Sequence, residues 1–205
     1  MEGTKIGAQG NAPRKSEGYP RVFLALPLPE EVRLALTRLR RRLEKVGTRV
    51  SWVEAADYHL TLAFIGDLAV EQTEALGEAL DVALHATRPF CFEVAGAGFF
   101  GPRCAPRVLW VGVPNPPPAM TALREKIMEL LRQKNLPVEE RPFHPHITLG
   151  RPRTRQGAVA LTDGLAGFMN TSHGVVGADR VSLMAGGTSP RGTRYRRLHE
   201  TILKG

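Results

Sequence analysis

The apolar positions of the chain fall into short continuous runs, each followed by a stretch with helical spacing. The run from Val22 to Leu26 ends at Pro27, and its length is typical of a buried strand. A helix is predicted to follow, beginning at Glu30. Its apolar positions are Val32, Leu36, Leu39, Leu43 and Val46, and its outward basic positions are Arg38, Arg41, Arg42 and Lys45. We interpret that basic face as solvent-exposed.

The succession of strand, proline and helix occurs a second time. A run from Val108 to Val113 ends at Pro114, and a second amphipathic helix follows with apolar positions at Met120, Leu123, Ile127, Leu130 and Leu131. After each helix comes a strand with nearly the same four residues, first His59-Leu60-Thr61-Leu62 and then His146-Ile147-Thr148-Leu149. From proline to histidine the distance is 32 residues in both copies. This regularity predicts an internal duplication with a pseudo-twofold relation.

The remaining pattern predicts an α+β fold with antiparallel sheets and outer helices. Leu76, Leu80, Ala83 and Leu84 indicate a further helix, and 90–100 indicates a strand with glycine-rich irregularities. Strands are also expected at 181–184 and 195–202, joined by a mobile, turn-rich loop at 186–192. Residues 1–18 are rich in Gly, Ser, Lys, Asn and Pro and are expected to be a flexible leader, so that 19–205 is a single domain with two lobes.

Composition indicates a globular protein with an excess of positive charge. Hydrophobic residues are 42% of the 205, and the net charge of +8 would attract polyanions such as nucleic acid, although an arginine-rich solvated surface has the same composition. Cys91 and Cys104 show no C-x-x-C spacing, which is typical of a reducing compartment. No apolar run approaches the ~20 residues that span a membrane. We therefore expect a soluble, cytoplasmic monomer.

Strand geometry divides each repeated motif into two faces. Because successive side chains alternate, His59 and Thr61 share one face of their strand, whereas Leu60, Leu62 and Phe64 are expected on the buried face. The second copy repeats the division, with Ile147 and Leu149 inward and His146 and Thr148 presented. Random order of the same composition predicts about 0.05 copies of H-x-T-L, so two copies point to function.

Two imidazoles that meet across one cleft suit phosphodiester chemistry. With an unperturbed pKa near ~6.5, one histidine can activate water while the other, as imidazolium, protonates the leaving oxygen, and neither role requires a metal. The hydroxyls of Thr61 and Thr148 can donate hydrogen bonds to the non-bridging oxygens, where negative charge accumulates. Pseudo-symmetry alone does not assign the acid and the base.

The paired H-L-T-L and H-I-T-L motifs resemble those of the two-histidine phosphoesterase superfamily, in particular its RNA 2′,3′-cyclic phosphodiesterase branch, also called 2′-5′ RNA ligases. The resemblance covers nearly everything after residue 19. Beyond the motifs it rests on Trp52 and on the stretches 21–27, 58–66 and 143–151. It implies a bilobal fold with both motifs in a central groove, and hydrolysis of RNA 2′,3′-cyclic phosphate ends to 2′-phosphomonoesters without a cofactor.

The resemblance also implies roles for individual residues. His59 would be the general acid that expels the 3′ oxygen, His146 the general base, and Arg151 a contact to the phosphate or terminal nucleotide. From the bare sequence, Arg151 could equally be part of a solvated strand end. Trp52, Phe143 and Tyr195 are candidates for stacking on a base, although each is also typical of a half-buried aromatic.

Three other interpretations compete with hydrolysis. His144 and His146 form an H-x-H pair of the kind that binds metals, but no third ligand follows at a recognisable spacing and H-E-x-x-H is absent. A non-catalytic binder of RNA ends or nucleotides is the alternative of a different class, although intact His and Thr in both motifs argue against it. Joining of RNA through a 2′-5′ bond is the third, and the chain lacks a Walker-type loop to drive it with ATP.

Overall fold

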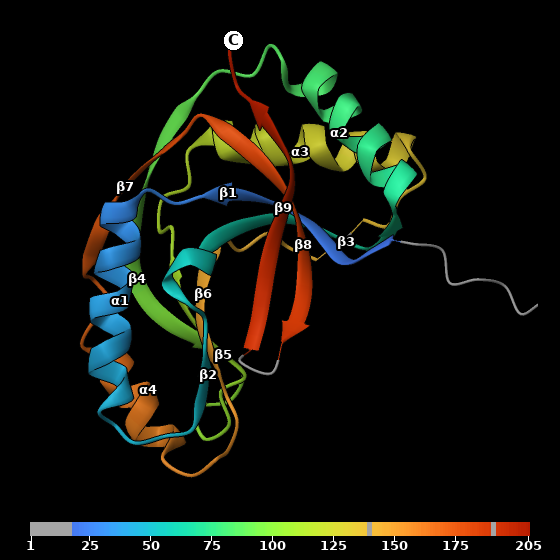
Figure 1. Ribbon diagram of the computed structural model, residues 1–205. Coiled ribbons are helices and arrows are strands. Elements are labelled where there is room, and N and C mark those ends of the chain that lie inside the picture. The colour runs from blue at the N-terminus through green and yellow to red at the C-terminus, as the bar shows by residue number, and fades with distance from the viewer. Residues whose placement is uncertain (1–17, 139–140, 190–191) are drawn as a thin grey trace, which may run out of the picture.

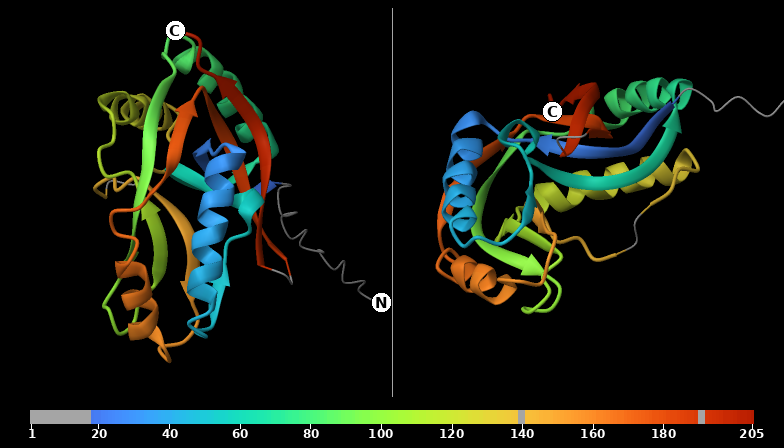
Figure 2. Two further views of the ribbon diagram at one scale, coloured as in Figure 1. Left: turned by 90° about the vertical axis from the view of Figure 1, so that its left-hand side faces the viewer. Right: turned by 60° about the horizontal axis from the view of Figure 1, so that its bottom comes forward.

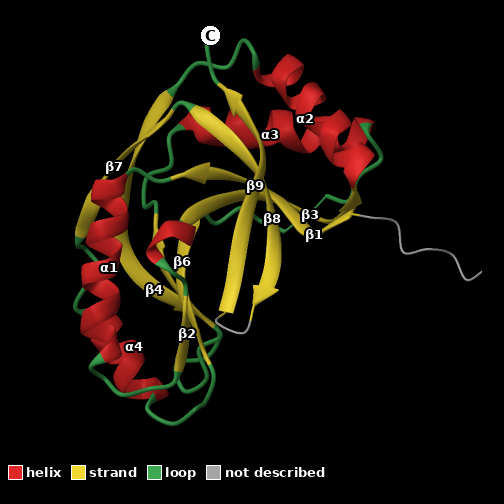
Figure 3. Cartoon of the chain, viewed as in Figure 1, coloured by secondary structure: helices red, strands yellow, loops and turns green. Residues whose placement is uncertain are grey.

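The strands of this protein form one curled antiparallel sheet with helices on its outside. The computed structural model describes residues 18–138, 141–189 and 192–205 (Figure 1). The strands are β1 (Gly18–Pro27), β2 (Val50–Trp52), β3 (His59–Ala69), β4 (Phe90–Phe100), β5 (Val108–Gly112), β6 (His146–Pro152), β7 (Ser172–Ala178), β8 (Arg180–Ser189) and β9 (Gly192–Ile202). The helices are α1 (Glu30–Glu44), the short η1 (Ala55–Asp57), α2 (Val70–Leu84), α3 (Pro118–Gln133) and α4 (Ala158–Ala166). Figure 3 shows the helices at the periphery of the sheet, so the predicted α+β architecture is confirmed.

The order of the strands reveals the duplication in space. The sheet runs β7-β4-β5-β6-β3-β1-β8-β9, with β2 paired to β6, so the two motif strands β6 and β3 lie side by side at its centre. β5 flanks β6 as β1 flanks β3, which is the arrangement that a pseudo-twofold between the motif strands requires. Outside them lie the antiparallel pairs β4 with β7 and β8 with β9. Each lobe therefore combines segments that are distant in the sequence (Figure 2).

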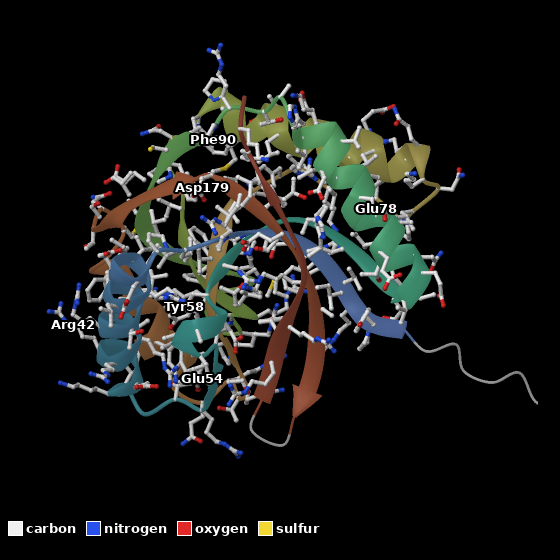
Figure 4. The ribbon with its side chains drawn as sticks, turned by 45° about the horizontal axis from the view of Figure 1, so that its top comes forward. Arg42, Glu54, Tyr58, Glu78, Phe90 and Asp179 are labelled. Carbon is white, nitrogen blue, oxygen red and sulfur yellow. The ribbon has the colours of Figure 1, made fainter. Side chains whose placement is uncertain are left out.

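The helices pair as the duplication predicts, since α1 packs against α4 and α3 packs against α2. Their contacts with the outer strands differ, because α1 packs against β7 and α2 packs against β9. The apolar positions predicted for α1 are buried at Val32, Leu36, Leu39 and Leu43. Its predicted basic face is exposed, and Figure 4 shows Arg42 directed away from the sheet.

The sequence pattern did not predict four of the elements, and its prediction of one loop was wrong. β2, η1, α4 and β7 were not expected, and the 186–192 segment is largely strand, since β8 extends to Ser189 and β9 begins at Gly192. In the ladder, Gly186 pairs with Tyr195 and Gly187 with Arg194. Backbone hydrogen bonds hold these residues in the sheet without an apolar pattern, which is why sequence periodicity missed them. Residues 190–191 lie outside the described residues.

The expected leader at 1–18 falls almost entirely outside the described part of the chain. Its last residue, Gly18, begins β1 and pairs with Ala69, so the fold starts one residue earlier than predicted. None of the described helices is both long enough and apolar enough to cross a membrane. Cys91 and Cys104 are both free and exposed.

A bulge in β3 corrects one prediction about the buried face. Leu24 pairs with Ala63 and Ala25 with Thr61, so Leu62 is the extra residue of an irregularity between them. One extra residue reverses the alternation beyond that point. Ala63 and Ile65 are therefore buried, and Phe64, expected inside, is 53% exposed. The aromatic ring thus comes to the same face as His59 and Thr61.

The packing of α1 makes a direct stability prediction. Leu36 is fully buried, whereas Leu34 on the same helix is 49% exposed. We expect Leu36→Ala to lower the free energy of unfolding by roughly 2 to 5 kcal/mol, because it removes buried methyl groups and leaves a cavity. Leu34→Ala should lower it by less than about 1 kcal/mol. Urea denaturation of both variants measures the difference, and equal losses would contradict the burial of Leu36.

Candidate active site

The two motif strands meet at a single registered pair. β3 and β6 run antiparallel with Leu60 opposite Ile147. In that register Thr61 lies opposite His146, and His59 lies opposite Thr148. All four polar residues are therefore on one face of the sheet, and each histidine neighbours the threonine of the other motif. The two histidines are diagonal neighbours across the strand pair.

Five of the predicted site residues line one cavity of about 240 Å³ at this face. They are His59, Thr61, Thr148, Arg151 and Tyr195. The other residues of its wall are Arg21, Phe23, Val53, Phe64 and Gly186. The cavity thus combines a histidine, three hydroxyls and two guanidinium groups, which is a set of groups suited to an anion.

His146 is placed differently from His59. It lines a second cavity, of about 380 Å³, and is not part of the wall of the first. The positive form of His146 nevertheless lowers the pKa of His59, so the two imidazoles are close enough for their charges to interact. Thr148, two residues further along the same face of β6, lines the first cavity.

Both histidines are oriented by the same local hydrogen bond. Nδ1 of His59 lies 2.7 Å from the carbonyl oxygen of Asp57, and Nδ1 of His146 lies 2.7 Å from that of His144. A carbonyl can only accept, so Nδ1 carries the hydrogen and donates in both cases. Nε2 is then the nitrogen that remains for acid or base chemistry. The carbonyl belongs to the residue two positions earlier in each copy, as the duplication predicts.

Aromatic rings hold each imidazole in place. Phe23 of β1 stacks on His59 with centroids 4.8 Å apart, and Tyr195 of β9 meets the same ring edge-on at 4.9 Å. Phe100 of β4 meets His146 edge-on at 4.9 Å, and Trp110 of β5 lies 6.5 Å from it. Such contacts restrict the histidine rotamers to one geometry.

Burial is the main influence on the pKa values of both histidines. It lowers the pKa of His59, and the charge of His146 lowers it further, while the hydrogen bond to Asp57 acts in the opposite direction. Burial also lowers the pKa of His146, the hydrogen bond to His144 acts in the opposite direction, and the positive charge of Arg151 adds to the effect of burial. In the free protein both imidazoles are therefore biased toward the neutral form at neutral pH.

The two halves of the site differ in charge at equivalent positions. Five residues after each motif histidine stand Phe64 in the first copy and Arg151 in the second. Two residues before each histidine stand Asp57 and His144. The groups that can carry positive charge at these positions both belong to the His146 half. The pseudo-symmetric backbone thus supports an electrostatically asymmetric site.

Two predicted base-stacking residues are not brought into either cavity. Trp52 lies on β2 opposite Gly150, where a Cβ would come within 2.8 Å of the indole, and packs partly buried against the core. Phe143 is also partly buried, and the guanidinium of Arg124 lies over its ring at 4.8 Å. Among the predicted aromatics, only Tyr195 reaches the first cavity.

Sequence reasoning missed several residues of the two cavities. Phe23 and Trp110 each precede their motif histidine by 36 residues, and that equal spacing was a signal available in the sequence. Phe64 carried no such signal, because the bulge in β3 decides its side. Arg21 also lines the first cavity. Its φ is positive, at 50°, and its backbone N–H donates to the carboxylate of Asp67 at 2.9 Å.

The described residues contain no group of three or more His, Cys, Asp or Glu side chains arranged to hold a metal ion. The H-x-H pair seen in the sequence is His144 and His146, and the Nδ1 of His146 donates to the carbonyl of His144 itself. No third ligand joins the pair within 18–138, 141–189 and 192–205.

A duplicated antiparallel sheet that sets two H-x-T strands side by side defines a two-histidine phosphoesterase. The model of the LigT like Phosphoesterase family matches this chain twice in succession, at residues 26–110 and 111–195. The chain belongs to this family. Each match contains one of the two H-x-T motifs, and the boundary between the matches falls within β5.

Known proteins are similar over most of the chain. The RNA 2′,3′-cyclic phosphodiesterase of Methanothermobacter thermautotrophicus is 31% identical over 176 residues, 85% of this chain and 94% of that protein. The protein of the same name from Geobacillus stearothermophilus is 36% identical over 129 residues, and the match spans only 41% of its length. The crystal structure of E. coli LigT complexed with 3′-AMP superimposes with a TM-score of 0.71 at 27% identity, covering 91% of this chain and 99% of that one.

The charge of Arg151 makes a prediction about His146. Because a nearby positive charge disfavours the imidazolium, we expect Arg151→Gln to raise the pKa of His146 toward its ordinary value. Titration of the histidine ring protons by NMR measures this, with His146 assigned from a His146→Asn variant. Arg153→Gln, two residues along the chain, is the matched control and should leave the pKa of His146 unchanged. An unchanged pKa in Arg151→Gln would mean that the guanidinium does not act on the imidazole.

Proposed function

We propose that this protein hydrolyses RNA 2′,3′-cyclic phosphate ends to 2′-phosphomonoesters by acid–base catalysis that needs no metal. The observation that carries the proposal is the antiparallel pairing of the two H-x-T strands, with Nε2 of each histidine left for catalysis. The names of the relatives support the substrate class, since they are RNA 2′,3′-cyclic phosphodiesterases at about 30% identity over most of the chain.

In the proposed reaction the two histidines act on opposite sides of phosphorus. His146 takes a proton from water as the new O–P bond forms, and His59 gives its proton to O3′ as the P–O3′ bond breaks. The hydroxyls of Thr61 and Thr148 donate to the non-bridging oxygens, and Arg151 balances their charge. The product carries its phosphate on O2′, and the pair returns to its starting protonation when His146 releases its proton to solvent and His59 takes one up from solvent.

The charge asymmetry of the site supports this direction. A general base must be neutral before the reaction, and the charge of Arg151 disfavours the protonated form of His146. His59 must be protonated, whereas burial lowers its pKa in the free protein. A bound phosphate anion offsets that effect, because a negative charge beside the imidazole favours its protonated form. Binding of the substrate would thus favour the protonated form of His59.

Other groups of the first cavity suit an RNA end. Arg21 and Arg151 supply positive charge on a protein whose net charge is +8, which favours association with a polyanion. Burial raises the pKa of Tyr195, so its hydroxyl stays protonated and able to donate to a ribose or phosphate oxygen. The exposed ring of Phe64 gives the rim an apolar surface.

Nucleotide binding without turnover is the second candidate function. E. coli LigT, 26% identical to this chain, has been crystallised in complex with ATP and with NADP+. Weak 2′-5′ joining is the third, since a hydroxyl in place of water would lead to a diester. Both candidates predict binding to the same face of the sheet, and only hydrolysis predicts that a cyclic phosphate is consumed without a second nucleotide.

The first test is an end-group assay on a short cyclic-phosphate RNA in excess EDTA. We expect the wild-type protein to form the 2′-phosphate, and His59→Asn and His146→Asn to lower kcat by roughly 10² to 10⁴-fold, since each removes a proton-transfer group. His85→Asn, outside both cavities, is the control for a loss of histidine and should retain the rate. Binding of the RNA without consumption would favour the second candidate, and loss of activity in EDTA would contradict a metal-free reaction.

The second test separates acid from base. A cyclic substrate with sulfur in place of O3′ has a leaving group that needs no protonation. We expect His59→Asn to recover most of the wild-type rate on this substrate, because the missing acid is no longer required. His146→Asn should stay impaired, because water still needs a base. Recovery in His146→Asn alone would reverse the two assignments, and recovery in neither variant would contradict proton donation to O3′.

A further inference from the structure

The ribbon that β2 forms with the end of β6 carries a row of arginines. Ser51 lies opposite Arg151, and the pairing continues past both strands, since the backbone N–H of Arg153 donates to the carbonyl of Arg49 at 2.8 Å. Because side chains alternate along extended chains, these four residues share one face of the ribbon. A hydrogen bond from Nε of Arg153 to Oγ of Ser51 agrees with this placement. We call Arg49, Arg151 and Arg153 the arginine row.

The arginine row begins at the first cavity. The register between β5 and β6 skips Leu149, which is therefore the extra residue of a bulge, like Leu62 in β3. As the bulge in β3 turns Phe64 outward, the bulge in β6 turns Arg151 to the face that carries Thr148, and both of these residues line the first cavity. The row continues that cavity along the ribbon, away from α2 and α3 (Figure 1).

No carboxylate interrupts the arginine row. The segments 45–53 and 141–162, which contain the row and its flanks, include neither Asp nor Glu. All three arginines are exposed, and none of them forms an ion pair within the described part of the chain. Exposed arginines elsewhere do pair with carboxylates, as Arg103 does with Asp163. Like charges gathered without counter-charges repel one another, so the row favours an anionic ligand that neutralises them.

We propose that the arginine row binds the phosphates of the RNA upstream of its cyclic end, so that the protein prefers an oligonucleotide to a single nucleotide. The inference rests on the proposed function, because it takes the first cavity as the place of the cyclic phosphate. A strand whose 3′ end is held at Arg151 lies at one end of the row, and its next phosphates reach Arg49 and Arg153. Guanidinium groups suit this role, because they bind phosphate through parallel hydrogen bonds.

The spacing of the row suits a single strand of RNA. Two residues of an antiparallel strand span about 6.8 Å, which is the separation expected between the backbone positions of Arg151 and Arg153. Successive phosphorus atoms of RNA are joined by six covalent bonds, which span a comparable distance when the strand is extended. A positively charged track of this kind follows the backbone of single-stranded nucleic acid. Because it contacts phosphates and not base edges, its affinity should not depend on base sequence.

Binding of a product RNA tests the row without turnover. The probe is a pentanucleotide with a 2′-phosphate end and a 5′ fluorophore, and its anisotropy is titrated at several salt concentrations. We expect Arg49→Gln/Arg153→Gln to weaken binding about tenfold at low salt. The slope of log K against log salt should become shallower by about 1.4, because each phosphate contact to a single strand contributes about 0.7. Arg49→Lys/Arg153→Lys keeps the charge and should retain most of the affinity and the slope.

A control variant separates the row from net charge. Arg88 follows α2 and Arg132 lies on α3, and both are exposed at the end of the molecule opposite to the ribbon (Figure 1). Arg88→Gln/Arg132→Gln removes the same formal charge as Arg49→Gln/Arg153→Gln and should keep the wild-type salt slope. Equal changes of slope in the two variants, or no change in Arg49→Gln/Arg153→Gln, would overturn the inference.

The effect of substrate length tests the consequence for turnover. We expect kcat/KM to be higher for a pentanucleotide with a cyclic phosphate end than for a cyclic mononucleotide. The ratio of the two values should fall about tenfold in Arg49→Gln/Arg153→Gln, with the loss in KM, because the row acts on binding. The same ratio in wild type and variant would overturn the inference while hydrolysis stands. If neither substrate is consumed, hydrolysis fails by itself, and the salt dependence of binding still decides whether the row binds RNA.

Discussion

The pairing of β3 with β6 is the interaction on which the rest of the site depends. Leu60 and Ile147 are fully buried behind the strand pair, and burying each contributes about 1.5 to 3 kcal/mol. Because side chains alternate along a strand, that burial forces His59, Thr61, His146 and Thr148 to the opposite face. A slip by one residue would turn the polar groups into the core, so hydrophobic burial selects the register that brings the two motifs together.

Duplication gives the protein two equivalent histidines, whereas the proposed reaction requires an acid and a base that differ. The backbone repeats closely enough that both Nδ1 atoms donate to the carbonyl two residues earlier at the same 2.7 Å. The difference lies in the surrounding side chains. Arg151 in one half occupies the position that Phe64 occupies in the other. A few substitutions on a symmetric frame therefore set the electrostatics without altering the geometry of the strands.

The same asymmetry extends to the cavities behind the histidines. The wall beside His146 is aromatic and apolar, and the wall beside His59 contains Arg33, Asp57 and Arg197. Related backbone positions thus present different chemistry on the two flanks of one site. Two sides of a phosphate bear different groups, so a pseudo-symmetric frame with unlike walls suits a substrate that is itself asymmetric.

Local patterns in the sequence determined the repeated strands and helices, the two H-x-T motifs and the side of the strand that carries them. Those features follow from periodicity and from short-range spacing, and Phe23 and Trp110 could have been found by the same spacing. Tertiary structure alone decided that Leu62 bulges and turns Phe64 outward, that Tyr195 arrives from β9, and that Trp52 and Phe143 stay outside both cavities. The physical reason is that these outcomes depend on contacts between residues far apart in the chain, and on backbone pairing that any side chain tolerates.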